Sequence, residues 1–167
     1  ENMNPDFPEV LIGIAELAVA LAGFTGVVVA FGSRQVGTWH PGDKLRLAFL
    51  LEASLTAGGF ALLSLLLYTN FDDESKAWAV ASGSWVLYML FSLYRSRELI
   101  VENLEHHDDV DIRANHLVFT FFALVIALQL ANVLLWQQFG PLLAAIVLNL
   151  AGAAMQFVRI IRASYRE

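Results

Sequence analysis

The chain has 167 residues, of which 57% are hydrophobic and only 16% are charged, and its formal net charge is −6. Soluble domains carry about 25% charged residues, and a soluble domain this small has too little interior to hide so much apolar surface. The chain contains no cysteine, which excludes disulfides, cysteine-ligated metals and thiol catalysis. The composition therefore favours a membrane protein, whose exterior is apolar as well.

Five apolar stretches follow one another along the chain, and at about 1.5 Å per residue they match a hydrocarbon core of about 30 Å. The expected fold is all-α: a compact bundle of five transmembrane helices that forms one domain over residues 1–167, with the last two spans as an antiparallel hairpin. The first stretch lacks a basic leader and a small-residue cleavage pattern, so we interpret it as a retained span and not as a signal peptide. The expected spans cover approximately residues 8–31, 45–68, 77–94, 116–136 and 142–158.

The basic residues indicate how these spans are oriented. Nine of the ten Lys and Arg fall into the first gap, the third gap and the C-terminal tail, whereas Lys76 is alone in the second gap. Short loops rich in Lys and Arg stay in the cytoplasm, so we expect the N-terminus outside and the C-terminus inside. A bacterial inner membrane is the expected location. The nine residues are Arg34, Lys44, Arg46, Arg95, Arg97, Arg113, Arg159, Arg162 and Arg166.

Small residues in the first two spans indicate close helix packing. In the first span they recur every four positions, which we interpret as one face that another helix approaches; these are Ala18, Ala22, Gly26 and Ala30. In the second span Gly58 and Gly59 mark a second close contact. Pro41 suits the first turn of that helix, and we expect the third helix to continue past Arg95 into the cytoplasm.

Two acidic residues, Glu16 and Glu52, lie within spans and carry the strongest functional signal. A charged side chain deep in a membrane helix is costly and is seldom kept without a use. On the expected topology Glu16 lies in the outer half of the membrane and Glu52 in the inner half, so they do not form one carboxylate pair within a subunit. They interact with a cation or proton, or they are neutral and hold helices together by hydrogen bonds.

Amide and hydroxyl side chains within the spans form a second polar set. We expect interhelical hydrogen bonds from them, with a polar lining for a pore or a small ligand as the alternative. By depth we group Gln129, Asn132 and Asn149 with Glu16, and we group Gln156 and Thr25 with Glu52.

Motifs for other functions are absent or weak. His106, His107, Asp108 and Asp109 match no metal-binding spacing, so we interpret them as a solvated turn. A haem or metal held by His40 and His116 is a distant alternative. The chain lacks the zinc-protease, nucleophile-elbow and phosphate-loop motifs, and it has no basic groove for nucleic acid. We therefore expect no enzyme activity, no metal and no cofactor.

Two functions remain from these observations. The first is an oligomeric ion or proton pathway in the lipid bilayer that uses Glu16 and Glu52. The alternative is a non-catalytic structural or accessory subunit of a larger membrane complex, in which the same polar residues hold helices together.

Overall fold

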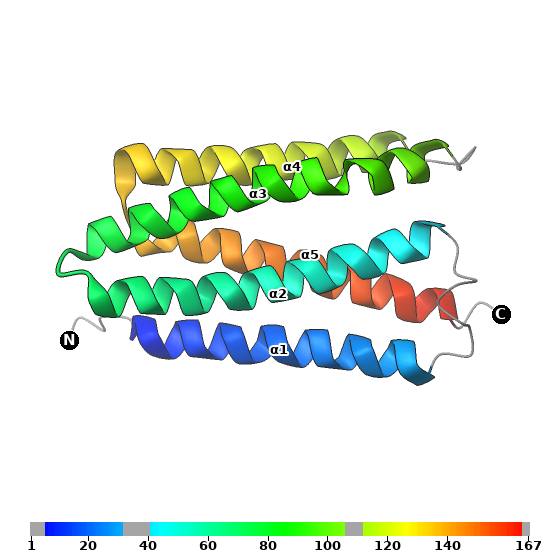
Figure 1. Cartoon of the computed structure of the whole chain (residues 1–167), viewed down its shortest axis with the longest axis horizontal. Helices are drawn as coiled ribbons and strands as arrows, with labels where there is room; N and C mark the ends of the chain where they lie inside the picture. Colours follow the sequence, from blue (N-terminus) through cyan, green and yellow to red (C-terminus); the bar gives the residue numbers. More distant parts are fainter. Residues whose placement is uncertain (1–5, 32–40, 106–111, 165–167) are drawn as a thin grey trace. The chain divides into compact units, whose positions relative to one another are not determined.

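A computed structural model describes residues 6–31, 41–105 and 112–164 (Figure 1). These ranges are helical and contain no strand, which confirms the expected all-α class. The helices are α1 (Phe7–Phe31), α2 (Pro41–Asn70), α3 (Glu74–Glu105), α4 (Ile112–Ala131), the π-helix η2 (Asn132–Trp136) and α5 (Phe139–Ser164).

Four helical segments within the described ranges are long and apolar enough to cross a membrane: Phe7–Val27, Lys44–Asn70, Glu74–Glu98 and Phe139–Ile161. A further apolar segment, Thr120–Trp136, is shorter. Segments of this length and composition indicate a membrane protein. The count of five spans and their orientation stay predictions.

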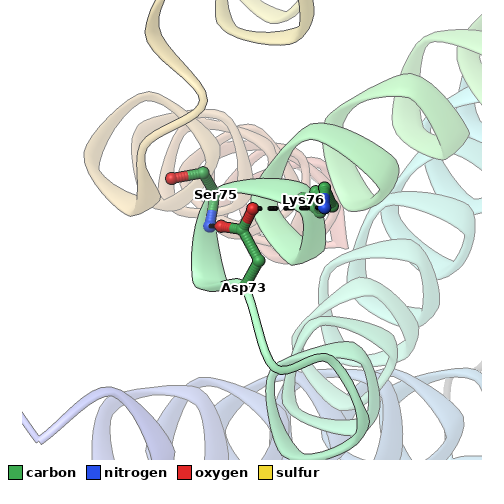
Figure 2. A network of polar contacts seen from close by, with 3 residues as sticks. All are labelled: Asp73, Ser75 and Lys76. Carbon is green, nitrogen blue, oxygen red and sulfur yellow. Dashed lines mark hydrogen bonds and ion pairs between the residues drawn. The ribbon is translucent and has the colours of Figure 1, made fainter.

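The helix boundaries follow local sequence signals. Asp73 precedes α3, and its Oδ1 accepts a hydrogen bond from the backbone N–H of Ser75 at 3.0 Å (Figure 2). A side-chain oxygen in this position satisfies a donor that the first turn leaves unpaired. Asp73 Oδ2 also lies 3.5 Å from Lys76 Nζ, an exposed pair that adds little stability. As expected, α2 begins at Pro41 and α3 continues beyond Arg95.

The chain forms two compact units, one from residues within 1–72 and 146–167 and the other from residues within 73–145. Helix α5 begins in the second unit, and its residues from Ile146 onward belong to the first. A single five-helix bundle requires the two units to pack against one another, so it stays a prediction. The same holds for an antiparallel pairing of the last two spans along their whole length.

In the first unit α1 packs against α2 in antiparallel orientation. The rings of Phe7 and Tyr68 meet edge to face with their centroids 5.8 Å apart. On successive turns of α1, the residues that face α2 are buried, namely Leu11, Ala15 and Ala18. Small residues on the buried side of α2 allow the two backbones to come close. These residues are Ser54, Ala57, Gly58, Ala61 and Ser64.

The closest recorded approach joins Ala18 and Gly58. A Cβ added at Gly58 would lie 3.2 Å from Ala18 Cβ, which is tighter than ordinary van der Waals contact. Gly59 lies on the exposed side of α2, and a Cβ there would meet no atom within 4 Å. Of the two neighbouring glycines, only Gly58 therefore makes a close helix contact within the described ranges.

The small-residue stripe of α1 does not stay on one side of the helix. Ala18 is buried, Ala22 is half-buried and Gly26 is exposed, whereas the side chain of Ala30 lies outside the described residues. The reason is geometric: with 3.6 residues per turn, each step of four advances about 40° around the helix. Within the first unit the stripe therefore does not share one environment, and its role as a packing face stays a prediction.

The second unit is built from α3, α4 and η2, together with the first residues of α5. Its buried residues on α3 recur at helical spacing and include Trp78, Ser82 and Trp85. The ring of Trp78 packs on that of Phe139 with the centroids 5.0 Å apart, which joins α3 to the start of α5.

The Ala18–Gly58 contact predicts opposite outcomes for two neighbouring substitutions. Gly58→Leu should lower the free energy of unfolding by about 1–3 kcal/mol, because the new side chain overpacks a filled interface. Gly59→Leu places the same side chain in open space and is the matched control. Reversible unfolding in mixed detergent micelles measures both; equal loss of stability in the two variants would contradict this packing.

Candidate functional site

Glu16 lies on the exposed side of α1. Its carboxylate has neither a hydrogen-bond nor an ion-pair partner within the part of the chain that the structure describes. It projects from the side of α1 opposite Ala15 and Ala18, which face α2. An isolated carboxylate on a helix of this apolar character is costly in lipid.

Glu52 has a different environment. It is half-buried on α2 and interacts with another group of the chain. The antiparallel register set by Ala18 and Gly58 places Glu16 two residues from that contact and Glu52 six residues from it on the opposite side. At about 1.5 Å per residue the two carboxylates are offset by about 12 Å along the helix axes. They therefore lie at separate levels of the first unit.

Polar groups of the first unit gather at the level of Glu52. Thr25 is buried and donates its hydroxyl to Leu21 O at 2.8 Å. Asn149 Nδ2 donates to Ala53 O at 3.0 Å, which ties α5 to α2 next to Glu52. Ser54 is fully buried, and its Oγ has no hydrogen-bond partner within the described ranges.

This arrangement changes one assignment of depth. Asn149 is level with Glu52, about 10 Å along the helix axes from Glu16, so grouping it with Glu16 is wrong. Sequence spacing alone does not give the position of α5 along the axis of α2. Gln156 is half-buried two turns further along α5, and its Oε1 accepts no hydrogen bond from the described residues.

The second unit contains a network around Asn132, at the start of η2. Asn132 is fully buried, and its Oδ1 accepts the backbone N–H of Gln138 at 3.0 Å. Its Nδ2 donates to Gln138 O at 3.0 Å and to Ser82 Oγ at 2.8 Å. One amide thus pairs with both backbone groups of Gln138 and also joins η2 to α3. We call Asn132, Ser82 and the backbone of Gln138 the amide clamp.

Gln129 lies one turn before the amide clamp and is also fully buried. Its Nε2 donates to Pro141 O at 2.8 Å, which joins α4 to the first turn of α5. Its Oε1 accepts no hydrogen bond from the described residues. The amide N–H of Gln129 is thus paired, whereas its amide oxygen is a buried acceptor without a donor. Such an acceptor is costly unless a water molecule supplies a donor.

The helix geometry at the amide clamp is unusual. The last turn before the α4–α5 connection is a π-helix, a wide form that proteins use in short pieces, often near functional sites. Gln137 then takes φ 51° and ψ 46°, the left-handed conformation that ends a helix. The wide turn and this reversal bring the backbone of Gln138 within reach of Asn132.

Chemically, three of the described amides act as hydrogen-bond donors between helices. Asn132, Gln129 and Asn149 each reach a different helix or its connection. Sequence reasoning paired Gln129 with Asn132 on one face but missed Ser82 and Ser54. No motif distinguishes these two serines from other serines in apolar helices. Each serine lies at helical spacing from small residues of the same helix, and this spacing is the only sequence signal that it lies on a buried face.

Metal-binding groups do not come together in the described ranges, where no three His, Asp or Glu side chains are placed to hold an ion. The turn residues His106, His107, Asp108 and Asp109 lie outside those ranges, as does His40. The side chain of His116 is likewise outside the described residues.

Comparisons with known proteins assign no relative to this chain. No protein-family model, no curated protein and no solved structure matches it.

The amide clamp predicts a large effect from one side chain. Asn132→Ala leaves the Ser82 hydroxyl and both backbone groups of Gln138 without their partner, so stability should fall by about 1–3 kcal/mol. Gln138→Ala is the control, because it removes an exposed amide and keeps the backbone that the clamp uses. Thermal unfolding in detergent compares the variants; an Asn132→Ala protein as stable as the control would contradict the clamp.

Proposed function

We propose that this chain is an integral membrane protein that assembles into an oligomeric pathway for protons or cations. Glu16 is the group that interacts with the transported species, at an interface outside the single protomer. The observation that carries the proposal is the exposed carboxylate of Glu16, which has no described partner on a helix that is apolar enough to span a membrane.

The energetic argument begins from the cost of that carboxylate. An ionised group at the middle of a membrane helix costs about 2.5–3.5 kcal/mol on insertion scales. Within Phe7–Val27 the charged residues are Glu9, near the start of the helix, and Glu16. A proton, a cation or a neighbouring protein surface offsets this cost. Acidic residues inside membranes commonly serve ion and proton pathways for this reason.

Glu52 supplies a second station in this proposal. Its half-buried carboxylate lies about 12 Å from the level of Glu16 along the helix axes. Polar groups accompany it at that level, including Thr25 and Asn149. A species that leaves Glu16 therefore meets a second polar layer further along the same unit.

Liposomes that contain the purified protein test the role of Glu16. Glu16→Gln keeps the size and the hydrogen-bonding capacity of the side chain but removes its charge. We expect it to lower proton or cation flux about tenfold or more, because a loss of only about 1.4 kcal/mol in barrier lowering slows a rate tenfold. Glu9→Gln removes a charge near the start of the same helix and should leave flux unchanged.

Flux and assembly are measured on the same samples. Size in mild detergent should be the same for wild type and Glu16→Gln, so that reduced flux reports on the carboxylate and not on assembly. If the wild type moves no protons, sodium or potassium, or if Glu16→Gln moves them equally well, the pathway proposal is wrong.

A second function, a structural or accessory subunit, has its own support. Amide N–H groups donate hydrogen bonds to acceptors within the chain at Asn132, Gln129 and Asn149. Such bonds hold helices together and do not line a pathway. Isolation of a different chain with this protein from native membranes, together with no flux from the protein alone, favours this alternative.

A further inference from the structure

We infer that the second unit binds one internal water molecule between Gln129 and Ser82, beside the amide clamp. The water donates a hydrogen bond to Gln129 Oε1 and accepts one from the Ser82 hydroxyl. Both residues belong to the second unit, whereas Glu16 and Glu52 belong to the first. The inference therefore does not depend on the proposed pathway.

The amide oxygen of Gln129 is a buried acceptor whose orientation is fixed. The side chain is fully buried, and its Nε2 lies 2.8 Å from Pro141 O. A carbonyl oxygen only accepts hydrogen bonds, so the NH₂ end of the amide must be the end that faces Pro141. The amide therefore cannot be flipped to satisfy Oε1 there. No described residue donates to Oε1, so its donor must be a bound molecule.

The Ser82 hydroxyl has the complementary requirement. It is fully buried, and its oxygen accepts a hydrogen bond from Asn132 Nδ2 at 2.8 Å. A hydroxyl also has a hydrogen to donate, and within the described residues no acceptor takes it. Ser64 on α2 shows the usual local solution, because its hydroxyl donates to Phe60 O four residues earlier. Ser82 makes no such bond within the described ranges, so its hydrogen needs an acceptor from elsewhere.

The spacing of the two groups suits a single bridging molecule. Gln129 and Asn132 are three residues apart, so they are separated by about 4.5 Å along the helix axis. Their partners at the start of α5, Pro141 and Gln138, are also three residues apart. Ser82 lies at the Asn132 end of this gap. Two successive hydrogen bonds of about 2.8 Å reach across up to about 5.5 Å, so one water molecule spans such a gap.

The chemistry of the two groups selects water over a cation. Water donates to Gln129 Oε1 and also accepts from Ser82, whereas a metal cation accepts no hydrogen. Among the described residues, the buried polar side chains carry hydroxyl and amide groups and no charge. A cation would therefore be buried without a counter-charge, which costs far more than an unpaired amide oxygen. Asn132 Oδ1 has a second lone pair available for the other hydrogen of the water.

A bridging water would extend the amide clamp by one helical turn. Ser82 lies on α3, Gln129 lies on α4, and the Gln129 amide already reaches the first turn of α5. A water-mediated hydrogen bond is nearly as favourable as a direct one. The water thus completes a polar network that connects three helices of the second unit.

A structure of the full-length protein in lipid, at a resolution that shows ordered water, tests the site directly. We expect a density peak within about 3.2 Å of both Gln129 Oε1 and Ser82 Oγ. Gln129→Leu should remove this peak, because the acceptor is gone. A direct bond from Ser82 to Gln129 Oε1, a coordinated cation, or no peak in the wild type would overturn the inference. The wild-type density decides alone if the variant does not fold.

Unfolding equilibria in mixed detergent micelles test whether the two groups depend on one another. Gln129→Leu and Ser82→Ala each remove one end of the bridge, so the second substitution should cost less once the first is present. The unfolding equilibrium constant of the double variant should therefore rise several-fold less than the product of the two separate rises. Ser84→Ala removes a half-buried hydroxyl from the same helix and is the matched control. Its effect should multiply fully with that of Gln129→Leu, and the same result for Ser82→Ala would overturn the inference.

Discussion

Polar groups inside apolar helices must find partners within protein, because lipid offers none. The described residues obey this constraint at three amides, two of them fully buried and one half-buried. Asn132 pairs with Ser82 and with both backbone groups of Gln138, Gln129 reaches Pro141, and Asn149 reaches Ala53. The Glu16 carboxylate is exposed and has no described partner, and the buried oxygens Ser54 Oγ, Gln129 Oε1 and Gln156 Oε1 also have none within the described residues. The bonded amides hold helices of this chain together, whereas Glu16 is the carboxylate for which we propose a partner.

Small residues provide the close packing on which these contacts depend. Gly58 lies close to Ala18 in the contact of α1 with α2, and that register sets the relative levels of Glu16 and Glu52 along the helix axes. In the second unit the π-helix η2 and the left-handed Gln137 bring a backbone segment to Asn132. In both units the polar contacts depend on close packing, because each contact requires two backbone segments to approach at positions that only particular residues allow.

Much of the fold could be predicted from the sequence, because length and apolar composition determine which segments are helical in a membrane. The start of α2 at Pro41 and the extension of α3 past Arg95 followed from local signals. The π-helix did not, since nothing in the sequence of Asn132–Trp136 distinguishes it from an ordinary last turn. The two glycines of α2 were found as a pair, but only the structure separates Gly58 from Gly59.

The candidate site was less accessible to sequence reasoning. Glu16 was found because an acid in an apolar helix is unusual, yet its outward direction depends on which side of α1 meets α2. The bond from Asn132 to Ser82 joins residues 50 positions apart, and spacing along one helix carries no information about such a pair. Steps of four drift around the helix, so Ala18 and Gly26 differ in exposure although they belong to one stripe.

The central claim is that protein, and not lipid, covers Glu16 in the membrane. A structure determined in a lipid bilayer tests it most directly, because it shows what lies against the exposed side of α1. We predict protein packed there, with a hydrogen-bond donor or a bound cation within reach of the Glu16 carboxyl group. Ordered acyl chains along Gly13, Glu16 and Gly23 would contradict the account.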